Sequence, residues 1–212
     1  MASRADVSFY RDMLHKAVVD CDGRLVGALL DLSAGPLTPS PEFARIRSLV
    51  VRPRRFGHVA SFKTVGNLLI VPWERVASLD SRSIRLRQPG RDLGPEMLQD
   101  NEVLLHKHIL DQQIVDCRGS KLHRVNDITM ALADGTLCLW GMDTGIRGFL
   151  TRLGFHWGLL SLLRPLHERL HHHVIRWDCV DRVEPARGWI RLRVSRDEVR
   201  STFHRTAQSP DA

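Results

Sequence analysis

The chain repeats itself internally, and this repeat constrains its fold more strongly than any other feature of the sequence. Residues 13–32 align without a gap on residues 109–128, so the second copy begins 96 positions after the first. Two further pairs of blocks match in the same order: Val71–Val76 with Ile175–Val180, and Ile84–Arg87 with Ile190–Arg193. Three matched blocks in one order indicate duplication rather than chance. The chain is therefore expected to contain two similar units.

Each copy opens with the pattern of a β-hairpin. An apolar strand, Ala17–Asp20 in the first copy and Gln113–Asp116 in the second, leads into a polar turn that ends in glycine, and a second strand follows. Gly23 and Gly119 are expected to supply the positive φ that such a turn requires. Both copies are thus predicted to start with the same hairpin.

Further short strands are predicted after each hairpin, with turn-forming residues between them. Their ranges are Ile46–Arg52, Val59–Val65, Leu68–Val71 and Ile84–Arg87 in the first copy, and Leu137–Met142 and Ile190–Val194 in the second. Many short strands separated by turns favour a barrel or sandwich over a parallel sheet. The predicted fold class is therefore mainly β, with two small barrels produced by the internal duplication.

The predicted organisation has four parts. The first barrel covers residues 9–88, and a connector rich in turn formers covers residues 89–103. The second barrel covers residues 104–196, and a polar, mobile tail covers residues 197–212. Within the second barrel, residues 146–173 are rich in leucine at helical spacing, which predicts a short helical insertion.

Several of these segments resemble the PRC-barrel family. They are Leu110–Asp116, Arg124–Asp127, Gly141–Gly145 running into Gly148–Gly154, and Trp177–Asp178. The chain most closely resembles the tandem PRC-like region of bacterial MgtE-like magnesium transporters and related CBS-domain proteins. The resemblance covers about Phe9 to Val194, and the second copy matches the family better than the first.

The resemblance implies a docking or regulatory module with no chemistry of its own. PRC-barrels also occur in the ribosome maturation factor RimM and in the H subunit of photosynthetic reaction centres, where they dock other molecules. The resemblance does not extend to the helical domain, CBS pair or membrane helices of the transporters, so no transport activity is implied. The implied partner is a protein such as a membrane transporter, with a link to magnesium transport.

Positive charge is concentrated in two stretches of the sequence. The chain carries a net charge of +7, whereas residues 45–63 alone carry +6 and residues 145–176 carry +4, which leaves the remainder at −3. Such patches attract nucleic acid, acidic proteins or anionic membranes. Arg52, Arg54 and Arg55 in the first stretch support an alternative function as an RNA- or ribosome-associated factor, although nucleic acid is the weaker interpretation.

The leucine-rich insertion carries the predicted contact surface for protein partners and for homodimer formation. Aromatic and aliphatic residues alternate with arginines there, as at the centre and rim of an interface. The predicted contact residues are Arg147, Phe149, Arg152, Leu153, Trp157, Leu160 and Leu163. The same composition also suits a lid packed on the second barrel or a helix lying on a membrane surface.

Other candidate residues receive structural interpretations. The repeated Asp20/Asp116 and Asp31/Asp127 are expected to accept backbone N–H bonds at turns and strand ends rather than to form an acid/base pair. In the densest histidine group, His167 and His171 lie at i and i+4 and are interpreted as part of an incomplete metal-ligand set. His106 and His108 lie outside this group. Cys21 and Cys117, at equivalent positions, are interpreted as small core residues with reduced thiols.

No enzyme activity is predicted from the sequence. It contains no recognisable nucleophile–base pair, phosphate-binding loop or complete metal-ligand set, so neither a cofactor nor a metal is expected. The amino-terminal residues lack an apolar segment typical of a signal peptide, and no run of about 18 apolar residues is present. A cytoplasmic location is therefore expected, with peripheral contact to the inner membrane as a variant of it.

Overall fold

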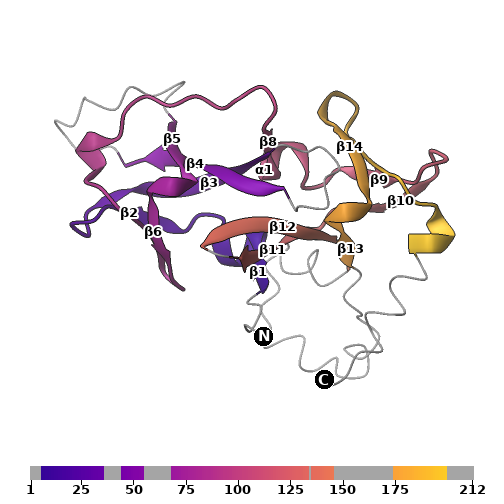
Figure 1. The fold of residues 1–212 in the computed structure, drawn as a ribbon, viewed down its shortest axis with the longest axis horizontal. Coiled ribbons are helices and arrows are strands. Elements are labelled where there is room, and N and C mark those ends of the chain that lie inside the picture. The colour runs from indigo at the N-terminus through magenta and orange to yellow at the C-terminus, as the bar shows by residue number, and fades with distance from the viewer. Residues whose placement is uncertain (1–5, 36–43, 55–67, 134, 146–173, 200–212) are drawn as a thin grey trace, which may run out of the picture.

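The computed structural model describes residues 6–35, 44–54, 68–133, 135–145 and 174–199, and these are built mainly from β-strands (Figure 1). The mainly β prediction is therefore confirmed. The first half of the molecule comprises the elements within residues 6–92. They are β1 (Asp6–Ser8), η1 (Phe9–Met13), β2 (Ala17–Val19), β3 (Leu25–Gly35), β4 (Arg45–Pro53), β5 (Leu69–Pro72), η2 (Trp73–Arg75), β6 (Val76–Leu79), β7 (Ser83–Leu86) and η3 (Gly90–Asp92).

The second half covers residues 103–199 and contains a similar series of elements. They are β8 (Val103–Leu104), α1 (Leu105–His108), β9 (Gln113–Val115), β10 (Lys121–Arg124), β11 (Asp127–Ala133), β12 (Thr136–Asp143), β13 (Val174–Arg176), η5 (Trp177–Cys179), β14 (Val180–Glu184), η6 (Pro185–Arg187) and β15 (Trp189–Leu192). A helical turn at residues 196–199 follows β15.

Strands of both halves join in one large sheet. Within the described residues this sheet has eleven strands, with the main order β1-β11-β12-β4-β3-β2-β7-β6, and it curls into a half-barrel. Off this path, β13 pairs with β12, β5 with β4 and β8 with β3. A second sheet has the order β10-β9-β15-β14 and belongs wholly to the second half.

The predicted hairpins are present in both halves with the same turn geometry. The Gly23 amide donates to the Asp20 carbonyl at 3.1 Å, and the Gly119 amide donates to the Asp116 carbonyl at 3.0 Å. Both glycines have positive φ, +78° and +83°, as the sequence predicts. Equivalent turns therefore form at the expected offset of 96 residues.

A less common backbone conformation also recurs at this offset, just before each hairpin. His15 has φ +65° and Asp111 has φ +63°, a region that non-glycine residues seldom adopt. Each donates its amide across the hairpin, His15 to the Leu29 carbonyl and Asp111 to the Val125 carbonyl, both at 2.9 Å. The correspondence between the halves thus extends from sequence to individual backbone hydrogen bonds.

The short strand that precedes each helical turn pairs with the opposite half. In the first half, β1 lies antiparallel to β11, with Ser8 opposite Thr129 and Val7 opposite Met130. In the second half, β8 lies antiparallel to β3, with Ser33 opposite Leu104 and Ala34 opposite Val103. The two halves therefore exchange their first strands reciprocally.

The halves also share one hydrophobic core. Phe9 and Met13 of η1 and their counterparts Leu105 and Ile109, 96 positions later, are all fully buried in the same cluster. Burial of apolar side chains is the main stabilising contribution to such a fold, so each half gains stability from the presence of the other. The division into two closed barrels remains a prediction.

Some predicted segments fall outside the described residues. They are the strand Val59–Val65, the helical insertion 146–173 and the tail from residue 200 onwards. The start of the predicted tail is a helical turn in which the Ser195 amide donates to the Glu198 carboxylate at 2.7 Å, and Val199 is buried. Among the described residues, no helix is long and apolar enough to span a bilayer.

Candidate functional site

The contact surface predicted on the insertion cannot be located in this structure. Seven of its residues, Arg147, Phe149, Arg152, Leu153, Trp157, Leu160 and Leu163, lie outside the described residues, as does Arg55. Arg52 and Arg54 are described and are exposed at the end of β4, where the Arg54 amide donates to the Val26 carbonyl at 3.0 Å.

Asp20 and Asp116 hold the hairpin turns, as expected. The Asp20 carboxylate accepts the Arg24 amide at 2.8 Å and the Gly90 amide at 3.1 Å, and Asp116 accepts the Ser120 amide at 2.7 Å. Desolvation opposes ionisation at both sites, but the amides outweigh it and keep the pKa of each carboxyl below its ordinary value. Both carboxylates are therefore structural acceptors.

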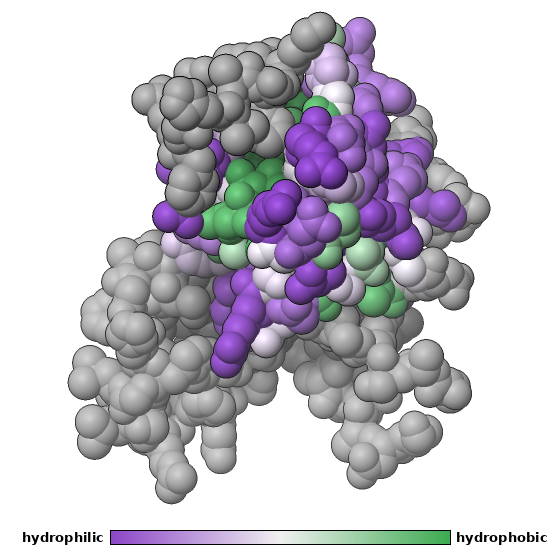
Figure 2. All heavy atoms as spheres, turned by 90° about the vertical axis from the view of Figure 1, so that its left-hand side faces the viewer, coloured by the Kyte–Doolittle hydropathy of each residue, from purple (hydrophilic) through white to green (hydrophobic). Residues whose placement is uncertain are grey.

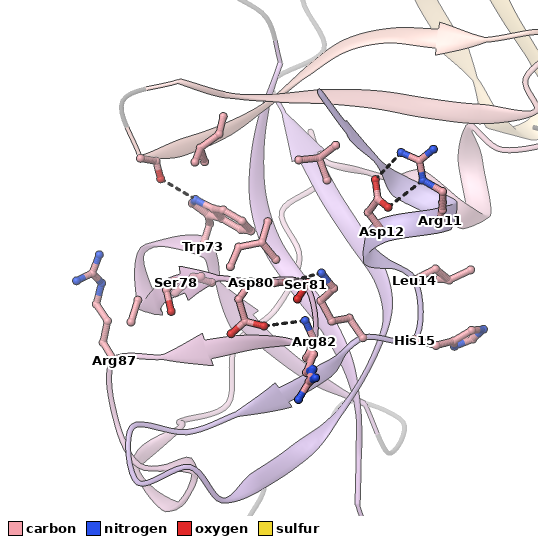
Figure 3. A pocket seen from close by; sticks show the side chains of 17 residues that line it. Arg11, Asp12, Leu14, His15, Trp73, Ser78, Asp80, Ser81, Arg82 and Arg87 are labelled. Atoms are coloured by element: carbon pink, nitrogen blue, oxygen red, sulfur yellow. Dashed lines mark hydrogen bonds and ion pairs between the residues drawn. The ribbon is translucent and has the colours of Figure 1, made fainter. Parts of the chain in front are cut away.

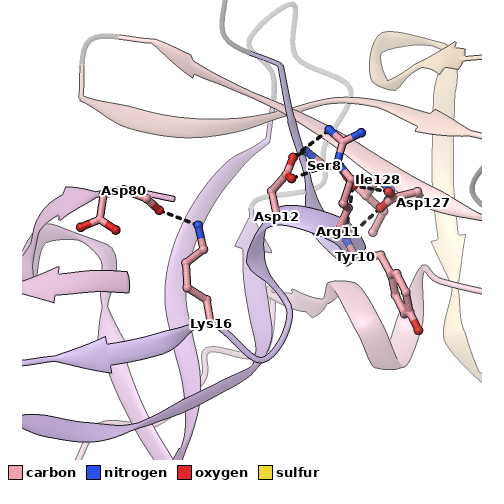
Figure 4. A network of polar contacts seen from close by, with 8 residues as sticks. All are labelled: Ser8, Tyr10, Arg11, Asp12, Lys16, Asp80, Asp127 and Ile128. Carbon is pink, nitrogen blue, oxygen red and sulfur yellow. Dashed lines mark hydrogen bonds and ion pairs between the residues drawn. The ribbon is translucent and has the colours of Figure 1, made fainter. Parts of the chain in front are cut away.

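Asp31 and Asp127 stabilise the helical turn of the opposite half. Asp31 accepts the amides of His106 at 2.7 Å and Lys107 at 3.2 Å, in α1. Asp127 accepts the Tyr10 amide at 2.9 Å, in η1, and also the Ser8 hydroxyl (Figure 4). Each carboxylate thus binds the short strand or helical turn that comes from the other half.

Burial dominates the ionisation of these two carboxyl groups. Desolvation raises the pKa of both Asp31 and Asp127 above the ordinary value, against the effect of the donors around them. Asp31 is only 6% exposed. All the hydrogen bonds described for Asp31 and Asp127 hold segments of the chain together, as the sequence predicts.

The histidine prediction is only partly covered. His167 and His171–His173 lie outside the described residues. The His108 Nδ1 accepts the Leu104 amide at 3.2 Å, and burial lowers the pKa of this imidazole. Within the described ranges no group of three or more potential metal ligands is present.

The core interpretation of Cys21 and Cys117 is wrong. Each lies two residues beyond the end of its strand, at the start of the hairpin turn, where its side chain is exposed and forms no disulfide. The strand ends one residue before Asp20 or Asp116, because these carboxylates close the turn. The cysteine positions are therefore on the surface in both halves.

A groove with a volume of about 690 Å³ lies where the first half meets the β11–β12 turn (Figure 3). Three parts of the chain line it. From η1 and the segment before β2 come Arg11, Asp12, Leu14, His15 and Lys16, together with Val7; from η2 to β7 come Trp73, Val76, Ala77, Ser78, Leu79, Asp80, Ser81, Arg82 and Arg87; from the second half come Leu132 and Gly135. This groove is the candidate site.

Apolar side chains form one part of the groove. The Trp73 indole Nε1 donates to the Gly135 carbonyl at 3.3 Å, which connects η2 to the β11–β12 turn of the other half. Leu132, in β11, is 50% exposed and is one of the few large apolar side chains that the described surface leaves open. Figure 2, which views the molecule from the left-hand side of Figure 1, shows small apolar areas among hydrophilic side chains.

Polar groups line the remainder of the groove. Arg11 and Asp12 form an ion pair at 2.9 Å, so their charges balance each other. Lys16 Nζ donates to the Asp80 carbonyl at 2.6 Å, and the Asp80 carboxylate accepts the amides of Arg82 and Ser83, both at 2.7 Å. Because these amides donate to it, the pKa of Asp80 is lowered, and the carboxylate stays ionised within its own turn.

Sequence reasoning missed this groove. Trp73 and Arg87 were visible as parts of repeated blocks, but Arg82 and Leu132 belong to no motif. They come together only because β1 crosses to β11 and places the β11–β12 turn beside η2. The sequence offered no signal for it, because alternation places Leu132 on the same face as Ile128 and Met130, which are buried.

Comparison with known proteins adds no relative. A scan against protein-family models matches none of them, and a search of curated proteins finds no significant match. The PRC-barrel resemblance therefore continues to rest on the residues quoted for it.

Proposed function

We propose that the protein is a non-enzymatic docking module made of two PRC-like halves related by duplication. The recurrence of the hairpins, of the positive φ at His15 and Asp111, and of the exchanged strands at one offset supports the duplication. The PRC-like character comes from the sequence resemblance, as does the expectation of a regulatory role linked to a magnesium transporter-like partner.

The observation that carries the docking proposal is the groove between the halves. It combines exposed apolar surface at Leu132 with cationic groups around it, an arrangement typical of protein-binding sites. The carboxylates of Asp20, Asp31, Asp116 and Asp127 all hold the backbone together. The scaffold thus presents a recognition surface supported by rigid internal contacts.

The test compares two surface variants of the full chain. Leu132→Asp places a charge in the groove, whereas Met97→Asp changes an exposed apolar residue, 75% exposed, outside the groove lining. Proteins captured from native lysate by wild type are expected to be lost with Leu132→Asp and kept with Met97→Asp. Identical captured sets for all three proteins would contradict docking at the groove.

A separate part of the proposal is that residues 146–173 mediate self-association. The alternative role for this segment is peripheral contact with a membrane surface. Sedimentation velocity should show a dimer for wild type and a shift to monomer for Trp157→Asp. A wild-type monomer that is unchanged by this substitution would exclude the insertion as a dimer interface.

The second candidate function is RNA binding through the first basic stretch. Arg52 and Arg54 are exposed at the end of β4, as phosphate contacts must be. A double Arg52→Glu, Arg54→Glu variant should then lose salt-dependent binding to single-stranded RNA. Wild-type protein that ignores RNA at low salt would remove this candidate.

A further inference from the structure

Strand β6 forms the end of the large sheet and lies in the candidate groove. Within the described residues it pairs with β7 alone. Its four residues, Val76–Leu79, all line the groove, and Ala77 and Ser78 are exposed. A terminal strand offers backbone N–H and C=O groups to another extended chain.

The register of β6 shows which residues offer these groups. Asp80 donates its amide to the Ser83 carbonyl at 3.0 Å, and Ser78 lies opposite Arg85, so these two residues face β7. In an antiparallel ladder the intervening residues direct their backbone groups the other way. Leu79 therefore directs its amide and carbonyl away from β7, towards the groove. At the bulge the Ala77 amide turns towards β7, because the Arg87 amide donates to the Arg75 carbonyl, and it is Val76 that directs its carbonyl outward.

The groove has a surplus of positive charge. Arg11 is paired with Asp12, and the ionised Asp80 carboxylate offsets one of the remaining cations, so four cationic side chains face two carboxylates. Lys16, Arg82 and Arg87 also line the groove, and none of them forms an ion pair with a carboxylate of the described chain. Electrostatic complementarity therefore selects an acidic partner.

The apolar part of the groove faces the same edge. Trp73 and Val76 lie on one side, and Leu132 comes from the opposite half (Figure 3 shows Trp73 above the β6 strand). Side chains of an extended peptide alternate between its two faces. A peptide with alternating acidic and apolar residues can therefore contact the cations and the apolar surface at once.

We propose that β6 is a strand-addition site that binds an extended acidic segment of a partner protein, with main-chain hydrogen bonds at Val76 and Leu79. The inference rests on the proposed docking function and deepens it by naming the chemistry of the partner. Main-chain pairing supplies affinity in such complexes, and side-chain pockets and charges supply specificity.

The binding test uses fluorescence anisotropy with the full chain and three labelled heptapeptides. One alternates glutamate and valine, the second alternates lysine and valine, and the third is the acidic peptide N-methylated at alternate residues. The acidic peptide is expected to bind about tenfold or more tightly than either control, since one lacks the charge and the other lacks the amide donors. Equal binding of the N-methylated peptide would overturn strand addition.

A pair of double variants tests where the peptide binds. Arg82→Glu with Arg87→Glu should weaken binding of the acidic peptide by about tenfold or more. Arg24→Glu with Arg91→Glu changes the charge equally at exposed arginines outside the groove lining and should leave it within about twofold. Equal loss in both would overturn the site.

Hydrogen exchange distinguishes pairing from general electrostatic attraction. The amide of Leu79 should become protected when the acidic peptide is added, and unchanged exchange there would overturn the proposal. Binding of a single-stranded RNA oligonucleotide without binding of the acidic peptide would overturn it as well. If the acidic peptide fails while Leu132→Asp still abolishes partner capture, the strand-addition inference falls and the docking function stands.

Discussion

The two halves differ most at the strand that follows the hairpin. In the first half, β3 runs unbroken over eleven residues and pairs with β4 as far as Gly27 opposite Pro53. In the second half the equivalent segment is split into β10 and β11, which belong to different sheets. One half is thus a continuous part of the large sheet, and the other is divided between two sheets.

One residue position explains much of this difference. A Cβ atom on Gly27 would lie 2.2 Å from the Arg52 carbonyl oxygen, so only glycine allows β4 to approach so closely. The equivalent position in the second half is His123, in β10. Here the chain bends away after Arg124, and the Asn126 amide donates to the Asp143 carbonyl at 2.8 Å. Similar hairpins can therefore lead into different sheets.

Removing the Asp31 carboxylate, which binds α1 of the opposite half, should have the largest effect on stability. Asp31→Ala leaves the amides of Leu32, His106 and Lys107 without their acceptor and should lower the free energy of unfolding by about 4 kcal/mol. Asp127→Ala should cost less, because Asp127 is more exposed than Asp31. Urea denaturation checks both, with Asp22→Ala in an exposed turn as the control. A larger loss at Asp127 would reverse the comparison.

Substitutions at Gly27 and at the equivalent residue, His123, should have the next largest effect on stability. Gly27→Ala forces the Arg52 carbonyl to move and should destabilise the protein by about 2 to 3 kcal/mol. His123→Gly makes the opposite change in the second half and should cost under about 1 kcal/mol, mainly through chain entropy. Equal losses in thermal or urea unfolding would show that Gly27 does not control the continuity of β3.

The glycines of the two hairpin turns should respond alike. Both have positive φ and ample space around the Cα atom, so Gly23→Ala and Gly119→Ala should each cost about 1 to 2 kcal/mol of backbone strain. The expected result is a matched pair of shifts in the urea midpoint. A difference of more than about 1 kcal/mol would mean that the turns are not energetically equivalent.

The smallest expected effect concerns the residue that accepts the amide at the start of each helical turn. The Ser8 amide donates to the Asp12 carboxylate at 2.9 Å, whereas the equivalent Leu104 amide donates to the His108 imidazole. Burial lowers the pKa of His108, so the unfolded state binds a proton more readily than the folded state. Stability should therefore fall as the pH drops through the ordinary histidine pKa of about 6.5 towards the lower folded value.

His108→Asp introduces the acceptor of the first half into the second and removes this contribution. The loss of unfolding free energy between pH 7 and pH 5 should be smaller in the variant than in wild type, by under about 1 kcal/mol. Parallel pH profiles for the two proteins would contradict the assignment of His108 as a neutral acceptor. His106→Asp, at an exposed neighbouring position, serves as the control.

The sequence predicted the local features and missed the long-range ones. The hairpins, with Gly23 and Gly119 in their turns, follow from apolar alternation and turn chemistry, which involve neighbouring residues. The exchange of β1 and β8 could not be predicted, because strands of three and two residues carry no periodicity. Asp31 was recognised as a structural acceptor, but its partners lie 75 and 76 positions away.

The candidate site shows the same limit. Its lining joins residues from the start, the middle and the second half of the chain, and their meeting depends on the strand exchange. The exposure of Cys21 and Cys117 was mispredicted because one residue of strand length decides whether a side chain faces the core or the turn.

The reciprocal crossing of the first strands also has a consequence for biosynthesis. As the chain leaves the ribosome from its amino terminus, the first half lacks β8 and the amides of α1, which belong to residues 103–108. Its own β1 likewise waits for β11, at residues 127–133. The first half therefore completes its strand pairing only after the second half has been translated as far as β11, so the two halves cannot mature strictly in sequence.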